Sequence, residues 1–460
     1  MPVSPARAAA FDILLRVERE SSYASELLHS STHEQLSTQD HALATELVMG
    51  VLRWQSALDG EIAQASSQPL RKLDPEILIT LRLGLYQFRW LDRVPPRAAL
   101  HESVELVKRA RKRSAAPFVN AVLRKLSTKT RTPESDSHDP AASAAALARS
   151  FAHPLWMVER WANDYGLAAA HQICQHDQSV PTTAVRLRAP SDESKLTDEG
   201  ISLLPGKLLT SARRVQTDDI TKTQAFRTGQ IVIQDEASQL VAALVGQGSR
   251  ILDCCAAPGG KTLAIADHNP QATITAMELH PHRARLLKKL LHRNEPDSNA
   301  PGSNQSESNQ RIQIVAADAR HLPTSGQFDR VLADVPCSGT GTLARNPEIK
   351  WRLITDNLAE LRQLQGAILR SALAQVASGG RLIYSTCSLE KEENEDVVDE
   401  VLRENNSFRL LDCGQELDRL KRSGELAFSD TPALTQGPYF RTIPGFLSCD
   451  GFFAAILERV

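Results

Sequence analysis

From about residue 231 onward, short apolar runs alternate with stretches of helical spacing, and this alternation constrains the fold more than any other feature of the chain. The pattern is typical of a sheet whose parallel strands are joined by crossover helices. The strand-like runs are Arg250–Asp253, Thr273–Glu278, Ile312–Asp318, Phe328–Asp334 and Arg381–Ser385. We therefore predict a doubly wound α/β domain over residues 231–460, and we expect a final run at 451–457 to be an edge strand.

The first 230 residues follow a different pattern. Over residues 1–131 apolar residues recur at helical spacing without strand-like alternation, which predicts an all-α bundle. Residues 132–149 are polar and then Ala-rich, and we predict a linker there. Residues 150–230 mix a helical pattern with a strand-like run, which predicts a small α+β module, and we expect this module to bind RNA. Within the α/β domain, residues 294–310 have the low-complexity composition of a surface loop.

Composition favours a globular protein of a reducing compartment. No apolar run approaches the ~20 residues that span a bilayer, and no export signal opens the sequence, so we expect a cytoplasmic protein without membrane contact. The seven cysteines lack the spacing of a disulfide framework, which predicts free thiols. Residues 1–131 carry 19 Lys and Arg against 14 Asp and Glu, with the excess concentrated in the run 108–113. Such a run either neutralises RNA phosphates or is an ordinary solvated helix face.

A glycine-containing loop follows the first strand of the α/β domain, and acidic residues lie where the successive strands end. Ligands of such sheets bind at this edge, where glycines allow close approach of the backbone. The loop lacks the spacing of dinucleotide and phosphate-binding loops, which favours an adenosine ligand without phosphates, such as S-adenosylmethionine. The candidate binding residues are Cys255, Ala256, Ala257, Pro258, Gly259, Gly260, Lys261, Glu278, Asp318 and Asp334.

Two cysteines follow neighbouring strands of the predicted sheet. Cys337 and Cys387 each come after an apolar strand and enter a turn rich in Ser, Thr and Gly, so both thiols should lie at the cofactor edge. A thiolate that adds to carbon 6 of cytosine turns carbon 5 into a nucleophile that accepts a methyl group, and an acid such as Asp334 stabilises the adduct. Cysteines 50 residues apart without further ligands do not form a zinc site, so no metal is expected. An isolated cysteine is by default an inert buried residue, and we expect this of Cys174, Cys413 and Cys449.

The motifs that carry this chemistry resemble those of the bacterial ribosomal RNA cytosine-carbon-5 methyltransferases of the RsmB (Sun or Fmu) type. The helical N-terminus is similar to a NusB-type RNA-binding domain. The methyltransferase motifs are CAAPGGK at 255–261, DVPCS at 334–338, RNPEIKW at 345–351, STCS at 385–388, QDEAS at 234–238 and EENE at 392–395. The NusB-type motifs are GVLRW at 50–54 and NAVLR at 120–124.

The resemblance implies a fold, a reaction and roles for particular residues. It implies a Rossmann-like domain that uses S-adenosylmethionine to methylate carbon 5 of a cytosine in 16S ribosomal RNA. Cys387 is then the covalent nucleophile and Cys337 assists release of the methylated base. Residues 255–261, position 278, Asp318 and Asp334 bind the cofactor, and Lys261 orients the loop and the base. Glu278 stands where the family usually has Asp, which keeps the carboxylate on a longer arm.

Other functions remain open on sequence alone. The same chemistry could act on transfer RNA or on large-subunit ribosomal RNA. An amino-group methyltransferase would carry an aromatic residue where this chain has Cys337. A non-catalytic RNA-binding factor would have lost a thiol or the glycine loop, and both are present. We expect the protein to be a monomer.

Overall fold

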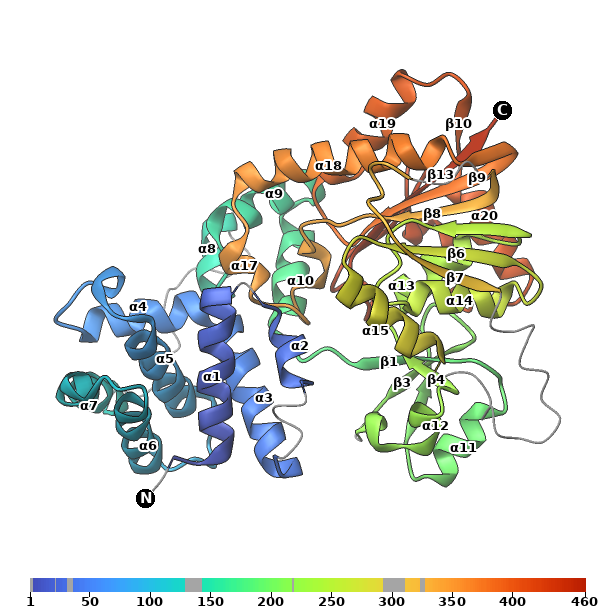
Figure 1. The fold of residues 1–460 in the computed structure, drawn as a ribbon. Helices are drawn as coiled ribbons and strands as arrows, with labels where there is room; N and C mark the ends of the chain where they lie inside the picture. Colours follow the sequence, from blue (N-terminus) through green and yellow to red (C-terminus); the bar gives the residue numbers. More distant parts are fainter. Residues whose placement is uncertain are drawn as a thin grey trace. The chain divides into compact units, whose positions relative to one another are not determined.

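The computed structural model of the chain consists of two compact units (Figure 1). One unit contains Met1–Val180 and Leu343–Arg352, and the other contains Pro181–Thr342 and Leu353–Val460. The described residues are 3–20, 22–30, 36–128, 143–216, 219–292, 311–322 and 327–460. The loop expected at 294–310 lies outside them. Within the described residues, no helix combines the length and the apolarity needed to cross a bilayer.

The described part of the first unit is helical, in agreement with the bundle predicted for residues 1–131. Apolar residues of its helices meet in a common core that includes Leu47, Leu81 and Leu123, each fully buried, and α5 is buried on all sides from Ile79 to Gln87. Pro75 occupies the first turn of α5, where its missing N–H costs no helical hydrogen bond. The helices here are α1 (Pro5–Glu20), α2 (Ala24–Leu28), α3 (Thr38–Arg53), α4 (Gln55–Ala65), α5 (Pro75–Trp90), α6 (Pro96–Arg109) and α7 (Ala116–Ser127).

Three further helices, α8 (Ala144–Ser150), α9 (Leu155–Tyr165) and α10 (Leu167–Asp177), also belong to the first unit. The small module expected over 150–230 is therefore divided, since its helices lie in one unit and its strands in the other. The apolar face of α9 explains this division, because Trp161 is almost completely buried among the helices of the unit. Of the linker predicted over 132–149, residues 132–142 lie outside the described residues, and α8 begins at Ala144.

The segment Leu343–Arg352, expected to belong to the methyltransferase domain, folds with the helical unit. It includes α17 (Ile349–Arg352). The Lys350 ammonium group donates to the carbonyl oxygens of Arg53 and Ala152 at 2.9 and 3.1 Å, and the Trp351 indole N–H donates to the carbonyl oxygen of Leu52 at 2.6 Å. The carbonyls of Leu52 and Arg53 lie at the C-terminal end of α3, where backbone acceptors have no partner within the helix and positive charge is favoured.

The second unit contains two sheets. The smaller sheet has the antiparallel order β2-β3-β1-β4. Its strands are β1 (Thr183–Leu187), β2 (Leu203–Pro205), β3 (Ala212–Val215) and β4 (Ile231–Ile233), with α11 (Asp192–Asp198) and α12 (Gln224–Arg227) between them. The larger sheet has the order β11-β12-β13-β9-β8-β5-β6-β7, and β10 also pairs with β13. Strands β5 to β9 are parallel, which confirms the predicted doubly wound core.

The strands of the larger sheet alternate with helices for most of its length. The strands are β5 (Arg250–Asp253), β6 (Thr273–Glu278), β7 (Ile312–Ala316), β8 (Phe328–Asp334), β9 (Val376–Thr386), β10 (Phe408–Leu411), β11 (Thr435–Gln436), β12 (Tyr439–Thr442) and β13 (Phe452–Arg459). The helices are α13 (Glu236–Leu244), α14 (Gly260–His268), α15 (Pro281–His292), α18 (Thr355–Leu373), α19 (Glu395–Arg403) and α20 (Cys413–Arg422).

The final strand β13 is an interior strand, so the expectation of an edge strand was wrong. It pairs with β9 on one side and with β12 and β10 on the other. Its central residues Ala454, Ala455 and Ile456 are buried on both faces, as the unbroken apolar sequence requires.

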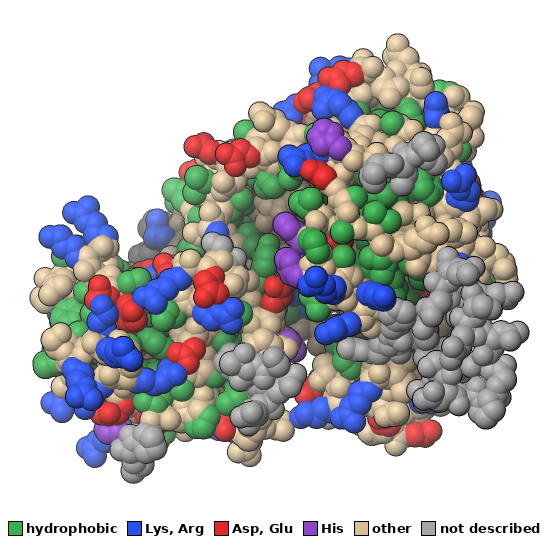
Figure 2. Space-filling view, viewed as in Figure 1, with side chains coloured by type: hydrophobic (Ala, Val, Ile, Leu, Met, Phe, Trp, Pro, Cys, Tyr) green, Lys and Arg blue, Asp and Glu red, His purple; other side chains and the backbone are tan. Residues whose placement is uncertain are grey.

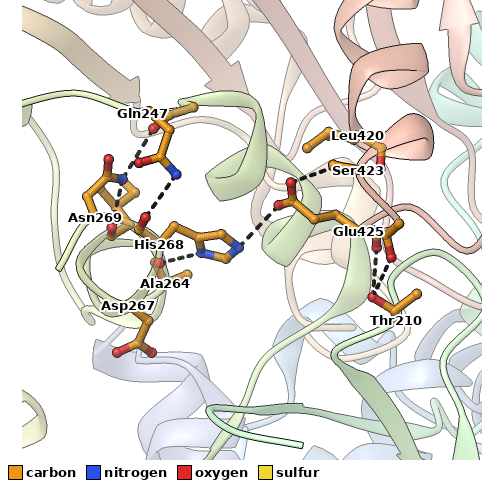
Figure 3. Close-up of polar contacts among 12 residues, drawn as sticks. Thr210, Gln247, Ala264, Asp267, His268, Asn269, Leu420, Ser423 and Glu425 are labelled. Atoms are coloured by element: carbon orange, nitrogen blue, oxygen red, sulfur yellow. Dashed lines mark hydrogen bonds and ion pairs between the residues drawn. The ribbon is translucent and has the colours of Figure 1, made fainter.

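The C-terminal end of α14 is attached to two other segments of the second unit (Figure 3). The Gln247 side-chain amide donates to the His268 carbonyl oxygen at 3.0 Å, and the His268 ring contacts the Ala264 carbonyl oxygen at 2.7 Å. The other ring nitrogen of His268 lies 3.5 Å from the Glu425 carboxylate, whose backbone carbonyl accepts from the Thr210 hydroxyl at 3.2 Å. These contacts hold the far end of the helix that begins in the glycine loop.

Candidate functional site

The glycine loop joins β5 to α14 in a conformation that only glycine adopts readily. Gly259 has φ +115°, and a Cβ added to it would lie 2.6 Å from Leu287 Cδ1 on α15. Gly260 follows as the first residue of α14, so the loop delivers the N-terminal end of this helix to the carboxyl edge of the sheet. The local sequence thus produces the close packing of loop, sheet and helix that a ligand site at this edge needs.

Gly259→Ala is expected to destabilise the protein by about 1–3 kcal/mol, because it combines an unfavourable backbone conformation with a side-chain clash. It should also weaken the binding of S-adenosylmethionine, the cofactor predicted from the sequence. Calorimetric titration and thermal unfolding measure the two effects. Gly379→Ala is the control, because Gly379 also has a positive φ (+70°) but open space around its Cβ position. Equal loss of cofactor affinity in both variants would contradict a specific role for Gly259.

The acidic residues at the strand ends have different surroundings. Asp253 is buried, accepts from the Thr262 hydroxyl at 2.7 Å, and has its pKa raised to about 6 by that burial. Glu278 ends β6 with its carboxylate largely buried, and one of its oxygens accepts from the His280 backbone N–H at 2.9 Å. Asp318 lies two residues beyond β7, and hydrogen bonds from the Arg320 guanidinium lower its pKa to about 2.

Lys261 and Asp334 form an ion pair at the edge of the sheet. The Lys261 ammonium lies 2.8 Å from one Asp334 oxygen, and the Ser385 hydroxyl donates to the other at 2.8 Å. Burial alone would lower the pKa of Lys261, but the carboxylate of Asp334 outweighs it and raises the pKa above its usual value; a charge on Cys387 acts in the same direction. Lys261 therefore remains a cation beside Asp334 and Cys387.

The two thiols that the sequence placed on neighbouring strands are in contact. Cys337 follows β8 and Cys387 follows β9, and their Sγ atoms lie 3.3 Å apart. The Cys387 backbone N–H also points to the Cys337 sulfur at 3.3 Å. The hydrogen bond with Cys387, and then burial, raise the pKa of Cys337 well above its usual value. Cys337 is thus a protonated thiol beside Cys387.

One buried carboxylate joins both cysteine loops, and sequence analysis did not identify it. Glu393 is fully buried and accepts from the Ser338 backbone N–H at 2.8 Å, from the Ser338 hydroxyl and from the Ser388 hydroxyl at 2.5 Å. The side-chain amide of Gln365 donates to it at 2.8 Å. Since Ser338 follows Cys337 and Ser388 follows Cys387, Glu393 connects the two thiols through their neighbours. The repeated Cys-Ser pair and the acidic motif at 392–395 were the available signals.

A buried acceptor also faces the start of α14. Gln234 has a buried side-chain oxygen for which the described residues provide no hydrogen-bond partner, and its amide carbon lies 3.4 Å from the Cβ position of Gly260. A buried acceptor of this kind needs a donor from outside the protein. Together with the Glu278 carboxylate and the glycine loop, it fits a ligand that presents hydroxyl or amino groups.

Three of the other cysteines lie in the core, away from the candidate site. Cys174, Cys413 and Cys449 are buried, and burial raises the pKa of each thiol, to about 12 for Cys413. These thiols are therefore poor nucleophiles. In the described part of the chain, no group of three or more His, Cys, Asp or Glu side chains is arranged to hold a metal ion.

Comparisons with known proteins identify two families. Residues 242–458 match the family described as 16S rRNA methyltransferase RsmB/F, and residues 4–128 match the NusB family. These matches confirm the predicted order of a NusB-like helical domain and a Rossmann-like methyltransferase domain.

Relatives match over nearly the whole chain. "Probable ribosomal RNA small subunit methyltransferase B" of Bacillus subtilis (strain 168) is 33% identical over 475 residues, which cover 100% of both chains. "Ribosomal RNA small subunit methyltransferase B" of Salmonella newport (strain SL254) is 31% identical and covers 93% of this chain and 92% of its own. The crystal structure of PH0851 covers 100% of both chains with a TM-score of 0.79 at 22% identity, which is a similarity of fold.

Proposed function

Because the chain belongs to the RsmB/F family of 16S rRNA methyltransferases, we propose that it methylates carbon 5 of a cytosine in 16S ribosomal RNA through a covalent adduct with Cys387. The observation that carries this proposal is the contact between the Cys337 and Cys387 sulfurs beside the Lys261–Asp334 pair. Methylation of an amino group needs no thiol nucleophile, whereas methylation of carbon 5 does. Ribosomal RNA as substrate implies a cytoplasmic location.

S-adenosylmethionine is the cofactor, and when bound it supplies an electrophilic methyl group. In our proposal the loop Cys255–Lys261 holds its adenosyl part, and the Glu278 carboxylate accepts from the ribose hydroxyls. Asp318 accepts from the adenine amine. Three N–H groups of Arg320 already donate to Asp318: the backbone N–H, the Nε–H and one Nη–H. A carboxylate has about four acceptor sites, so one remains for the adenine amine.

The first half of the reaction is nucleophilic attack on the cytosine ring. The Cys387 thiolate forms a bond to carbon 6, and the electrons of the double bond between carbons 5 and 6 shift into the ring. Ring nitrogen 3 takes the proton of Asp334, which enters the step as the carboxylic acid and leaves it as the carboxylate. Carbon 5 then has the electron density to accept the methyl group. Lys261 supports this step as a cation that holds the Asp334 carboxylate in place.

The second half releases the product, and the surroundings of Cys337 support its part in it. The carbon-5 proton must leave and the bond from Cys387 to carbon 6 must break. The largest influence that raises the pKa of Cys337 is its hydrogen bond with Cys387. In the adduct the Cys387 sulfur is a neutral thioether, so this influence disappears, the pKa of Cys337 falls and its thiolate forms more easily. A Cys337 thiolate, which can accept a proton, is thus easier to form at the stage when proton removal is required.

Bisulfite sequencing of 16S ribosomal RNA from cells with and without the gene tests the proposed function. We expect one cytosine to be protected from conversion only when the gene is present, and we expect purified protein with S-adenosylmethionine to restore the protection. If a cytosine of a transfer RNA or of large-subunit ribosomal RNA is protected instead, the proposed chemistry stands and the proposed substrate is wrong. Loss of an amino-group methylation without loss of any 5-methylcytosine would contradict the proposal.

A further inference from the structure

Helix α15 presents a row of exposed cations in the second unit. Its sequence from residue 281 to residue 292 contains basic residues and no acidic residue. The side chains of His282, Arg285, Lys288 and Lys289 are exposed, and within the described residues none of these four forms an ion pair. Figure 2 shows Lys and Arg side chains gathered over the part of the molecule where Figure 1 places α15. We name Arg285, Lys288 and Lys289 the α15 basic face.

The opposite, buried side of α15 packs against the candidate cofactor site. Leu287 is fully buried and packs with Ala256 of the glycine loop and Ala276 of β6. Leu287 is also the side chain that fills the space beside Gly259. The helix begins three residues after Glu278, so its exposed side adjoins the edge of the sheet where the reaction is proposed to occur.

The basic run predicted from the sequence, 108–113, differs from the α15 basic face in its pairing. Three of its cations are bound to carboxylates of the same unit. The pairs are Lys108 with Glu105 at 2.6 Å, Arg109 with Asp12 at 2.6 Å and Lys112 with Asp74 at 2.8 Å. A cation already paired with a carboxylate must give up that partner before it neutralises a phosphate, so these three are weaker phosphate ligands than unpaired cations.

We propose that the α15 basic face binds the phosphate backbone of the substrate RNA next to the target cytosine. This proposal rests on the proposed function and specifies which surface of the catalytic domain holds the RNA. Three positive charges within two helical turns, with no acidic residue on the same helix, complement a polyanion and not a typical protein surface of mixed charge. Binding through phosphates orients the strand without reading its sequence.

The test compares two triple variants of the full-length protein that lose the same charge. One is Arg285→Gln/Lys288→Gln/Lys289→Gln, and its matched control is Lys108→Gln/Arg109→Gln/Lys112→Gln, which also removes two lysines and one arginine. Binding of an unmodified 16S ribosomal RNA fragment, and of an unrelated RNA of equal length, is measured over a range of salt concentrations without cofactor. Thermal unfolding and S-adenosylmethionine affinity are measured in parallel to verify the fold.

For the α15 variant we expect the slope of log affinity against log salt to fall by about one per lost contact, equally for both RNAs. In the control variant this slope should fall clearly less. Both variants should keep their affinity for S-adenosylmethionine. The proposal would be overturned if the α15 variant kept the wild-type slope. It would also be overturned if the slope of the control variant fell as much as that of the α15 variant, or more. Unchanged binding of naked RNA with weaker binding of small-subunit particles would identify a protein partner and also overturn it. A wild-type protein that fails to methylate carbon 5 would overturn the proposed function while leaving this comparison of slopes valid.

Discussion

Cys387→Ala is expected to abolish both methylation and every covalent adduct with RNA, while S-adenosylmethionine still binds. The reason is that the variant lacks the sulfur that we propose adds to carbon 6, and without that bond carbon 5 is too poor a nucleophile to take the methyl group. Incorporation of radioactive methyl groups into 16S ribosomal RNA measures the activity. A denaturing gel shows whether protein remains attached to RNA.

Cys337→Ala is expected to form the covalent adduct with RNA but to release it slowly. Attack and methyl transfer need the Cys387 thiolate and remain possible, but the step that removes the carbon-5 proton and expels Cys387 should slow down. The variant should therefore accumulate as a denaturant-resistant complex with RNA that collapses to free protein after nuclease treatment. Cys413→Ala serves as the control, because this buried thiol lies in the core outside the cluster, and it should methylate like the wild type once folded.

The two variants together decide which thiol is the nucleophile. A trapped complex in Cys387→Ala and none in Cys337→Ala would reverse the assigned roles. Absence of any trapped complex in both variants, with methylation intact in one of them, would rule out a mechanism in which both thiols act.

Glu393→Ala is expected to lower kcat by about 100-fold, because displacement of a reacting group by about 1 Å has an effect of this size. Glu393 accepts from Ser338 and Ser388, which follow the two cysteines, and its removal leaves buried donors without an acceptor. The two thiols should then no longer be held in contact. KM for S-adenosylmethionine should change little, since Glu393 contacts neither the glycine loop nor Glu278.

Two further variants separate positioning from stability. Glu393→Gln should recover most of the activity, because its oxygen can accept from Gln365 and the Ser338 N–H while its amide group donates to the two serine hydroxyls. Asp192→Ala removes another buried carboxylate of the same unit, one that accepts from the Ala189 backbone N–H at 2.8 Å. It should lower the melting temperature without lowering kcat of the folded protein. A similar loss of kcat in Asp192→Ala would show that Glu393 acts only through stability.

Much of the catalytic domain was predictable because its signals are local. Apolar runs of strand length separated by helical stretches specify a parallel sheet, and parallel strands bring their carboxyl ends to one edge. The contact between Cys337 and Cys387 follows from this geometry, since Cys387 comes directly after β9 and Cys337 lies three residues beyond the neighbouring β8. The glycine loop is equally local, because the φ of Gly259 depends on the absence of its own side chain.

Other features depend on partners that are distant in the sequence. The motif at 345–351 reads as part of the catalytic domain, yet Lys350 and Trp351 find their hydrogen-bond acceptors at the end of a helix about 300 residues earlier. The position of β13 inside the sheet, in place of the expected edge, likewise depends on strands that pair with it from both sides.

The sequence by itself predicted the fold classes, a cofactor edge and a pair of neighbouring thiols, because each prediction rests on local periodicity or on residues at or just beyond the ends of strands. Only the tertiary structure decided that Glu393 joins the two cysteine loops, that three cations of the run 108–113 are paired with carboxylates, and that the α15 basic face is unpaired in the described residues. The physical reason is that a hydrogen bond or an ion pair is decided by which groups meet in space, and residues far apart in the chain meet only after the fold has formed.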